Sequence, residues 1–315
     1  MNDQNVVSMG RVEGEAADVY HGMHAVSASR LRVFARNPGG PQLYHQRYVA
    51  KSLEDSDSEA MLEGRAIHCL ALEGAEKFAR EYVTVPEDAP KRPTKAQLNA
   101  KKPGPATVAA VRWWSDFDAA NAGREVITGD MLARVECVER AIRGHPLAAQ
   151  LFARGEAEMT WRVRAPGLPH LPPLQCRPDW FCAEGCELTD GRPFILDIKT
   201  TGTLDEEEFG SWQRGFELHG YHRQAAFYMA ILDLLGVDVR DFLFVVPEKC
   251  APYGVKIGRL NDRALAQGQD EVARLLMRLD ECYGRNLWPN APLGLLDFNL
   301  SARYYARAAE KGGEL

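Results

Sequence analysis

Hydrophobic residues recur at helical spacing through the first half of the chain and at strand spacing through the second half. In the first half, the pattern predicts helices over residues 58–72, 107–120 and 128–152, the last with a break at His145-Pro146. A further helix is predicted to begin after an N-cap at Ser27 and to end by the breaker cluster at residues 37–41. Residues 1–25 show no clear periodicity, so we expect a flexible leader there.

From about residue 156 the pattern changes to alternating and short continuous apolar runs, which are typical of β-strands. These runs predict strands over residues 159–164, 174–181, 193–200, 242–247 and 253–257, with helices over 221–235 and 264–283. A succession of strand, helix and strand is typical of an α/β fold. We therefore expect a mixed β-sheet flanked by helices, preceded by a largely helical N-terminal part.

Residues 84–105 differ from the rest of the helical half. Prolines interrupt regular structure there, and residues 91–102 contain Lys91, Arg92, Lys95 and two further lysines but no acidic residue. This composition predicts a basic, mobile loop with one turn of helix. Because basic side chains neutralise phosphates, Lys91, Arg92 and Lys95 are candidate contacts to a DNA backbone.

Composition excludes several classes of protein. Of the 315 residues, 45% are hydrophobic and 26% are charged, as in soluble globular proteins, so the chain is not disordered as a whole. No stretch approaches the roughly 18 apolar residues that span a bilayer, and the polar N-terminus carries no secretory signal. We therefore expect a cytoplasmic protein with no membrane partner. The formal net charge of −6 argues against non-specific binding of nucleic acid, but a local basic patch can still face DNA, since charges more than about 8 Å apart are screened.

The seven cysteines are scattered along the chain, and their odd number argues against a disulfide framework. Cys182 and Cys186 are close in sequence, but no second closely spaced pair completes a four-ligand metal site. We therefore expect buried, unpaired thiols and no iron–sulfur cluster.

The most informative residues are Asp179, which follows Arg177-Pro, and the triplet Asp197-Ile-Lys199. Because side chains alternate along a strand, Asp197 and Lys199 share one face, and Ile198 points to the other face and into the core. A turn between the two predicted strands lets Asp179 lie beside Asp197. Converging carboxylates suit Mg²⁺ or Mn²⁺, and the backbone carbonyl of Ile198 can complete the ligand set. Lys199 is then placed to orient or deprotonate the attacking water and to offset charge on the phosphate.

Three further features are consistent with this site, although each alone has a simpler structural interpretation. His68 lies one helical turn after Gly64, and a neutral imidazole is the commonest nitrogen ligand of metals. Glu158 precedes a predicted strand and is a candidate to hold a second ion or a water. Gln224 and Tyr228 share one helix face, where an amide and a phenol can hold a phosphate or the catalytic strand.

These residues resemble a known family. Gly64-x3-His68, Pro178-Asp179, Asp197-Ile-Lys199 and Gln224-x3-Tyr228, in this order, look like the RecB-type branch of the PD-(D/E)xK nuclease superfamily. The similarity is closer still to the RecE-type exonucleases (exodeoxyribonuclease VIII-like) of phages and prophages. Supporting strings are Ser27-x-Ser29, Gly220-Tyr221-x2-Gln224-Ala-Ala-Phe-Tyr228 and Val246-Pro-Glu248-Lys249-x2-Pro252-Tyr253-x-Val255. The resemblance covers residues 26–290, which we expect to form one exonuclease domain followed by a tail over 291–315.

The resemblance implies a role for each matching residue. His68, Asp179 and Asp197 are implied to be metal ligands, Lys199 to be the catalytic lysine, and Glu158 to occupy a recurrent acidic position. Gln224, Tyr228 and Tyr221 match a motif that supports the active site or the DNA. The implied cofactor is Mg²⁺, with Mn²⁺ as a substitute. The chain lacks the cysteine set of the iron–sulfur members, so the resemblance carries no cluster over.

The implied activity is hydrolysis of double-stranded DNA from a 5′ end, which leaves a 3′ single-stranded tail. Relatives of this type form ring-like homo-oligomers on DNA ends and work with a RecT-like single-strand annealing protein in recombination. Polarity, processivity and ring formation rest on the resemblance alone.

Two alternatives remain open. A RecB-like nuclease of other polarity, or with a preference for single strands, would carry the same core residues. A DNA-binding protein with a decayed site would be expected to lack at least one of His68, Asp179, Asp197 and Lys199, and all are present. Mg²⁺-dependent release of nucleotides separates these classes, because a binding protein retards DNA in a gel without releasing nucleotides.

Overall fold

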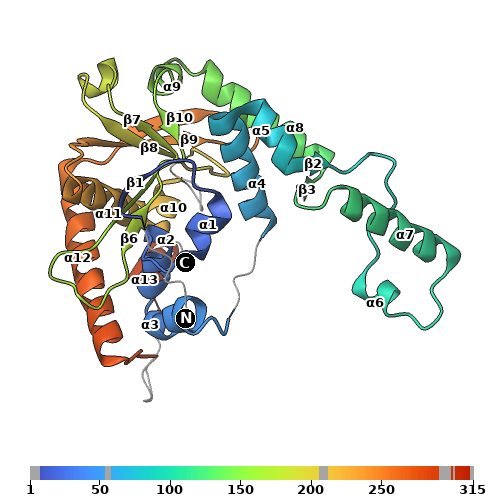
Figure 1. Ribbon diagram of the computed structural model, residues 1–315, viewed down its shortest axis with the longest axis horizontal. Coiled ribbons are helices and arrows are strands. Elements are labelled where there is room, and N and C mark those ends of the chain that lie inside the picture. Colours follow the sequence, from blue (N-terminus) through green and yellow to red (C-terminus); the bar gives the residue numbers. More distant parts are fainter. Residues whose placement is uncertain (1–7, 54–57, 206–211, 291–298, 301, 313–315) are drawn as a thin grey trace.

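The computed structural model describes residues 8–53, 58–205, 212–290, 299–300 and 302–312. At its centre lies a five-stranded sheet in the order β10-β9-β8-β7-β4 (Figure 1). Its strands are β4 (Glu156–Ala157), β7 (Trp180–Cys182), β8 (Phe194–Ile198), β9 (Asp241–Pro247) and β10 (Val255–Arg259). β8 and β9 are parallel, and the other neighbours are antiparallel. The prediction of a mixed sheet flanked by helices is confirmed.

Helices build the N-terminal part and cover the sheet, as the sequence predicts (Figure 1). Ser27 caps α2 by accepting a hydrogen bond from the backbone N–H of Arg30, and a break at His145 separates α8 from α9. The α-helices outside the projection described below are α1 (Ala17–Gly22), α2 (Ala28–Phe34), α3 (Gly40–Tyr44), α4 (Glu59–His68), α5 (Gly74–Glu81), α8 (Gly129–Gly144), α9 (Pro146–Leu151), α10 (Trp212–His219), α11 (Tyr221–Leu234), α12 (Asp262–Arg285) and α13 (Ala302–Gly312). Tighter or wider turns are η1 (His45–Val49), η2 (Cys69–Glu73) and η3 (Glu187–Thr189).

Strand β8 separates two hydrophobic cores because its side chains alternate between them. Ile195 packs into the core formed with α2, α11 and α12, whereas Phe194, Leu196 and Ile198 pack into the core formed with α4, α8 and α9. The burial of Ile198 on the face opposite to Asp197 agrees with the predicted alternation.

Residues 8–25 are not a flexible leader, so the sequence-based expectation is wrong for this segment. β1 (Gly10–Val12) pairs antiparallel with β5 (Thr160–Val163), which in turn pairs with β6 (Leu174–Cys176). Helix α1 follows, and the guanidinium of Arg30 donates to backbone carbonyl oxygens near its end. Contacts with distant segments hold these residues, and local periodicity carries no signal of such contacts. Residues 1–7 lie outside the described part of the chain.

The strand predicted over residues 174–181 is in fact two strands, β6 and β7, in different sheets. The chain passes between the sheets at residues 177–179. Pro178 has no N–H group to donate to a ladder, so pairing stops there. The break leaves Asp179 at the start of β7 rather than in the middle of a continuous strand.

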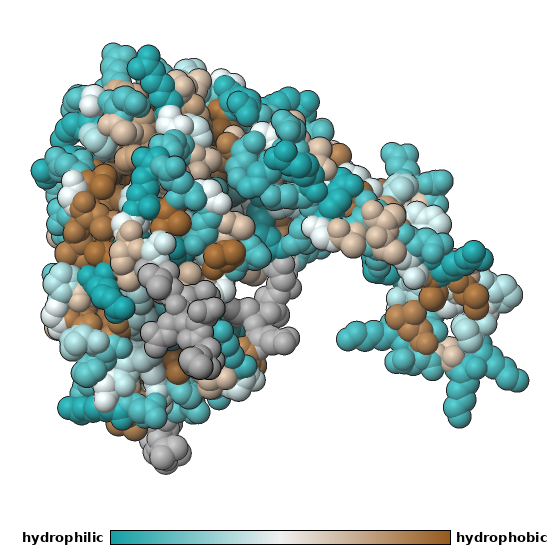
Figure 2. Space-filling model, viewed as in Figure 1, coloured by the Kyte–Doolittle hydropathy of each residue, from teal (hydrophilic) through white to brown (hydrophobic). Residues whose placement is uncertain are grey.

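Residues 85–124 form a projection, named the arm below, that extends from the body of the molecule (Figure 1). β2 (Tyr82–Thr84) and β3 (Glu125–Ile127) pair in parallel at its base, and it contains α6 (Lys95–Leu98) and α7 (Pro105–Ala120). The loop with one turn of helix predicted over residues 84–105 matches the single turn of α6. Hydrophilic side chains cover much of the arm, around a smaller hydrophobic patch (Figure 2).

Within the described residues, no helix has the length and apolar character needed to cross a membrane. In the predicted tail, residues 302–312 form α13, and residues 291–298, 301 and 313–315 lie outside the described part.

Candidate active site

The ends of several elements meet in one cleft with a volume of about 1040 Å³. His68 ends α4, Glu158 follows β4, and Asp179 directly precedes β7. Asp197 lies in β8, and Lys199 follows its last residue. Together with Tyr221, Gln224 and Tyr228 of α11, these residues line the cleft. The fold thus brings together residues that lie up to 160 positions apart in the sequence.

Asp197 is buried and is held by three donors. Lys199 Nζ donates to Oδ2 of Asp197 at 2.7 Å, Gln224 Nε2 donates to the same oxygen, and the backbone N–H of Asp179 donates to Oδ1 at 3.3 Å. Burial, together with the charge of Asp179, raises the pKa of Asp197 to about 6, although Lys199 opposes this shift. The carboxylate is therefore fixed in one orientation by contacts that come from the residue after β8, the residue before β7 and α11.

His68 and Asp179 lie at the end of β8. Oδ2 of Asp179 accepts a hydrogen bond of 2.6 Å from the backbone N–H of Ile198 and lies 3.5 Å from Nδ1 of His68. The other ring nitrogen of His68, Nε2, lies 3.1 Å from the carbonyl oxygen of Ile198. The carbonyl predicted to be a ligand is thus next to the imidazole.

Glu158 follows β4 and lies next to Asp179. Its backbone N–H donates to the carbonyl oxygen of Asp179 at 3.1 Å, and its φ of 55° lies in the left-handed region, which costs energy for a residue other than glycine. Burial raises the pKa of Glu158 to about 8, and the charge of Asp179 adds to this shift. A strained backbone and a carboxyl group with a raised pKa are both features that cluster at functional sites.

A divalent cation fits this donor set. His68, Glu158 and Asp179 each offer one ligand atom, and these atoms lie within 4.8 Å of one another. Burial and the neighbouring carboxylate of Asp179 together raise the pKa of Glu158. A cation bound between these carboxylates would compensate their negative charge. Oxygen ligands with one imidazole suit hard or borderline divalent ions. Asp197 lies beside this set and contacts Lys199 and Gln224 instead.

Residues of α11 support the strand that carries Asp197. Gln224 contacts Asp197 and forms a hydrogen bond with the hydroxyl of Tyr228, which is buried and has a pKa well above its ordinary value because of that burial. Lys199 Nζ lies 5.1 Å from the ring centre of Tyr221, within the range of a cation–π interaction. Gln224 and Tyr221 therefore contact the Asp197–Lys199 pair, and Tyr228 contacts Gln224.

The basic residues singled out in the arm do not line this cleft. Lys91 and Lys95 are exposed on the arm. Arg92 forms a bidentate ion pair with Asp118, at 2.8 and 3.1 Å, and lies 4.0 Å from the ring centre of Trp114. The indole N–H of Trp114 donates to the carbonyl of Pro90, so Arg92 closes an internal cluster of the arm and is not free for a substrate.

Sequence reasoning missed a buried carboxylate that holds α4 in place. Glu63 accepts a hydrogen bond of 2.6 Å from Arg134 of α8 and forms an ion pair of 3.1 Å with Lys249, which follows β9. Burial would raise the pKa of Glu63, but the hydrogen bonds from Arg134 and Lys249 outweigh it and lower the pKa. These contacts fix the helix that carries His68. Only Lys249 lies in a string that the sequence singled out, so the pattern gave no signal for Glu63.

Comparison with known proteins agrees with this geometry. Residues 27–292 match the sequence profile of a family described as PDDEXK-like domain of unknown function (DUF3799). No curated protein matches the chain. Among solved structures, the fold is similar to that of a candidate exonuclease from Eubacterium rectale, with a TM-score of 0.59 and 13% sequence identity. The similarity covers 95% of this chain and 98% of the other, and at this identity it shows a shared fold.

Proposed function

The chain belongs to the family of PDDEXK-like domains, and on this premise we propose that it is a metal-dependent exodeoxyribonuclease. The observation that carries the proposal is the convergence of His68, Glu158 and Asp179 beside the Asp197–Lys199 ion pair in one cleft. Carboxylates and an imidazole can hold a divalent cation, and a buried lysine beside them can stabilise the charge that develops on a phosphodiester during hydrolysis. The resemblance of these residues to RecE-type enzymes supports DNA as the substrate.

The cation we propose is Mg²⁺, with Mn²⁺ as a substitute. His68, Glu158 and Asp179 would hold it, and Asp197 and the carbonyl of Ile198 are adjacent. When bound, the cation supplies positive charge to the scissile phosphate and makes water more acidic. The protein supplies the position and the compensating charges around it.

Lys199 acts as a cation in this proposal. Burial lowers the pKa of the lysine, but the charges of Asp197 and Asp179 outweigh this effect and raise it. A protonated amine cannot take a further proton. Its ammonium group instead stabilises the negative charge that develops on the phosphate and orients the attacking water. Asp197 fixes that ammonium, and Gln224 fixes Asp197.

We propose further that the enzyme degrades double-stranded DNA from a 5′ end and leaves a 3′ single-stranded tail. The strings Asp197-Ile-Lys199 and Gln224-x3-Tyr228 support this reading through their resemblance to RecE-type enzymes. The arm supports the choice of a long polyanion, because Lys91, Lys95, Lys101 and Lys102 are all exposed on it. Tyr82, Gly123 and Glu125 at the base of the arm line the cleft, so DNA that leaves the cleft on this side runs toward the arm.

The test is digestion of linear duplex DNA labelled at either the 5′ or the 3′ end, in Mg²⁺ or in EDTA. A closed circle serves as the control. We expect early release of the 5′ label in Mg²⁺, an intact circle, and no release in EDTA. Early release of the 3′ label would contradict the proposed polarity, and a preference for single strands would contradict the proposed duplex substrate. Either result would favour another type of RecB-like nuclease. A gel shift without release under any divalent metal would overturn the enzymatic proposal and leave a DNA-binding protein.

The proposed setting is recombination in the cytoplasm, with a RecT-like annealing protein and a ring-like homo-oligomer that encloses the DNA. This part rests on the resemblance alone. Sedimentation equilibrium of the purified protein tests the oligomer, and a monomer at micromolar concentration would contradict it. Stimulation of strand annealing by a RecT-like protein, measured on the tailed product, tests the partner.

A further inference from the structure

A short segment that precedes the region matched by the family forms one wall of the cleft. Residues 10–22, named the N-terminal strap, comprise β1 and α1. The family match begins at residue 27. Glu15, Asp18, Tyr20 and His21 of the strap nevertheless line the same cleft as the candidate metal ligands. The strap is therefore part of the site although it lies outside the matched domain.

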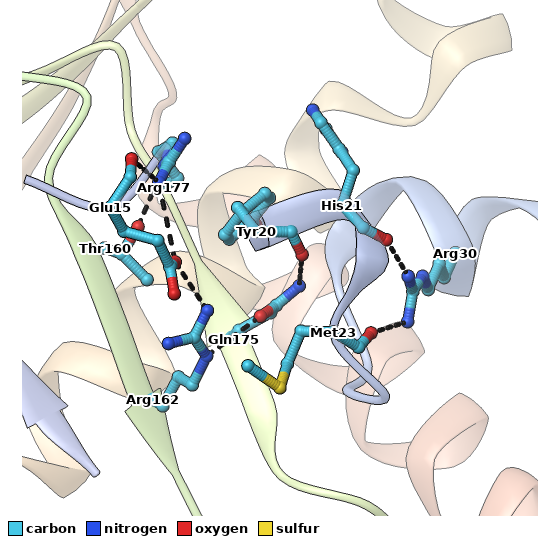
Figure 3. Close-up of polar contacts among 9 residues, drawn as sticks. All are labelled: Glu15, Tyr20, His21, Met23, Arg30, Thr160, Arg162, Gln175 and Arg177. Atoms are coloured by element: carbon cyan, nitrogen blue, oxygen red, sulfur yellow. Dashed lines mark hydrogen bonds and ion pairs between the residues drawn. The ribbon is translucent and has the colours of Figure 1, made fainter. Parts of the chain in front are cut away.

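The strap is attached to the site through one buried carboxylate. The side chain of Glu15 is only 6% exposed and lies between two buried guanidinium groups, as Figure 3 shows. Arg162 Nη2 donates to Oε2 of Glu15 at 2.5 Å, and Arg177 Nη2 lies 3.5 Å from the same oxygen. Arg177 also donates to the backbone carbonyl of Glu15 at 2.7 Å and lies 4.5 Å from the ring centre of Tyr20.

Arg177 connects this carboxylate to both segments that carry acidic candidate ligands. It directly precedes Pro178-Asp179 in the chain. Its Nε donates to Oγ1 of Thr160 at 2.8 Å, and Thr160 lies two residues after Glu158 (Figure 3). A single arginine therefore belongs to the segment that carries Asp179 and contacts the strand that follows Glu158.

Glu15 compensates the positive charges of two buried guanidinium groups. Arg162 and Arg177 are 1% and 7% exposed, and Glu15 is the carboxylate paired with both. Removal of one partner from a buried ion pair leaves an uncompensated charge, which the structure relieves by moving that charge toward water. The cleft is the nearest opening, since Arg177 itself lines it. Such a movement would draw Arg177 away from Thr160 and shift Asp179 relative to Glu158.

We propose that Glu15 is a positioning residue for the metal site. It acts through Arg177, which it holds against Thr160, and so sets the spacing between Glu158 and Asp179. The proposal rests on the cation site of the proposed function and does not depend on the DNA substrate or on the polarity of cleavage. Under this proposal, the N-terminal strap, which lies outside the matched domain, contributes to the geometry of the metal site.

The experiment measures the affinity of the full-length, metal-free protein for Mn²⁺ by electron paramagnetic resonance of the free ion, without DNA. We expect Glu15→Gln to weaken binding by about 10-fold or more, since residues that orient metal ligands typically contribute 10- to 100-fold to affinity. The matched control is Arg11→Gln. Arg11 lies in the same strap, but it pairs with Glu156 at the surface and makes no contact with Arg177. We expect its Mn²⁺ affinity to equal that of the wild type.

Circular dichroism at the assay temperature separates positioning from folding. A folded Glu15→Gln protein with wild-type Mn²⁺ affinity would overturn the proposal. If Glu15→Gln does not fold, Thr160→Val breaks the same connection at its other end with a side chain of similar volume. It should also weaken Mn²⁺ binding several-fold, and unchanged affinity of the folded Thr160→Val protein would likewise overturn the proposal. When Glu15→Gln and Thr160→Val are combined, the loss of Mn²⁺ binding free energy should be smaller than the sum of the two single losses, because both changes act through Arg177.

Failure of the proposed function gives a different result. A wild-type protein that binds Mn²⁺ but releases no nucleotides from DNA would refute the nuclease, and the role of Glu15 in the cation site would stand. A wild-type protein that binds no Mn²⁺ would refute the cation site and this role together.

Discussion

At the scale of single residues, Lys199 is the side chain whose loss should separate binding from chemistry. Lys199→Ala removes the ammonium that lies 2.7 Å from Asp197, and we expect kcat to fall. One positioned charge that stabilises a transition state contributes about 100- to 1,000-fold to kcat, so a loss of this size is expected. The affinity for DNA, measured by filter binding in EDTA, should change little because the buried lysine contacts few phosphates.

Lys77→Ala is the control for this change. Lys77 also lines the cleft, but it pairs with Glu73 and Glu81 and has no contact with Asp197. We expect near-normal kcat for this variant. If Lys199→Ala kept wild-type turnover, the catalytic role of Lys199 would be wrong.

Glu158 gives the metal-free protein a measurable pH dependence. Burial and the charge of Asp179 raise the pKa of Glu158 from 4.5 to about 8. Between these values the unfolded chain releases the proton and the folded chain retains it. The contribution of Glu158 to the free energy of unfolding therefore falls as the pH rises from about 4.5 to about 8. Glu158→Gln removes this contribution, so in EDTA at pH 8 it should be more stable than the wild type by about 2 kcal/mol, the cost of a poorly compensated buried charge.

Urea unfolding in EDTA at several pH values between 5 and 8 checks this expectation. The stability difference between Glu158→Gln and the wild type should grow with pH. Glu156→Gln, a change of an exposed glutamate in β4 two residues before Glu158, serves as the control and should leave the slope unchanged. A constant difference between Glu158→Gln and the wild type across this range would contradict the raised pKa.

The sequence was sufficient for residues whose geometry follows from a local rule. The period of a strand placed Asp197 and Lys199 on one face and Ile198 in the core, and the structure has this arrangement. The contact between Gln224 and Asp197 joins a helix to a strand 27 residues away. The helix face of Gln224 and the family resemblance indicated a role at the site, but neither specified this contact. Glu63 and Glu15 had no signal at all, because a buried charge paired over a long distance looks like any surface charge in the sequence.

At the scale of elements, the strands that could be predicted are those whose position follows from the local pattern rather than from contacts with distant segments. β8 is apolar except for Asp197, and β9 is apolar after Asp241, so both strands have clear ends. The apolar pattern continues across the boundary between β6 and β7, and Pro178 is the local mark of the break. β1 has three residues and exists because β5 offers it an edge, so its position depends on tertiary structure. The predictions thus failed where pairing partners, rather than the local pattern, decide the structure.

If the arm binds DNA, its lysines should contribute a predictable part of the salt dependence of DNA affinity. Each phosphate neutralised by a lysine on duplex DNA adds about 0.9 to the slope of log K against log salt. Replacing Lys91, Lys95, Lys101 and Lys102 with glutamine should therefore lower that slope by up to about 3.6. The measurement is fluorescence anisotropy of a labelled duplex in EDTA over a series of salt concentrations. Turnover at saturating DNA should remain near normal, since these residues do not line the cleft.

Four changes on a different surface provide the control. Arg263, Arg274, Arg278 and Arg285 all lie on α12, away from the arm (Figure 1). Replacing these with glutamine removes the same formal charge. An equal loss of slope in both variants would show that the effect is one of net charge and not of the arm. An unchanged slope in the arm variant would show that the arm does not contact the DNA backbone.

At the scale of the whole molecule, the cleft is built from segments that extend from Gly14 to Leu275. Its carboxylates therefore meet only in the folded chain, and a cation that binds them stabilises the folded state alone. At a concentration of 100 times its Kd, such a ligand adds about 2.7 kcal/mol to the free energy of unfolding. For a chain of this size, we expect Mn²⁺ to raise Tm by roughly 5 °C above the value in EDTA.

Asp179→Asn should abolish most of this increase, because Asp179 is the residue that contacts both His68 and the end of β8. Asp118→Asn changes an exposed carboxylate on the arm and should retain the full increase, even if it lowers Tm itself through the loss of its pair with Arg92. Differential scanning calorimetry of the three proteins, each in Mn²⁺ and in EDTA, measures this increase in Tm. An equal increase in the wild type and in Asp179→Asn would place the cation elsewhere, and the assignment of His68, Glu158 and Asp179 as its ligands would then be wrong.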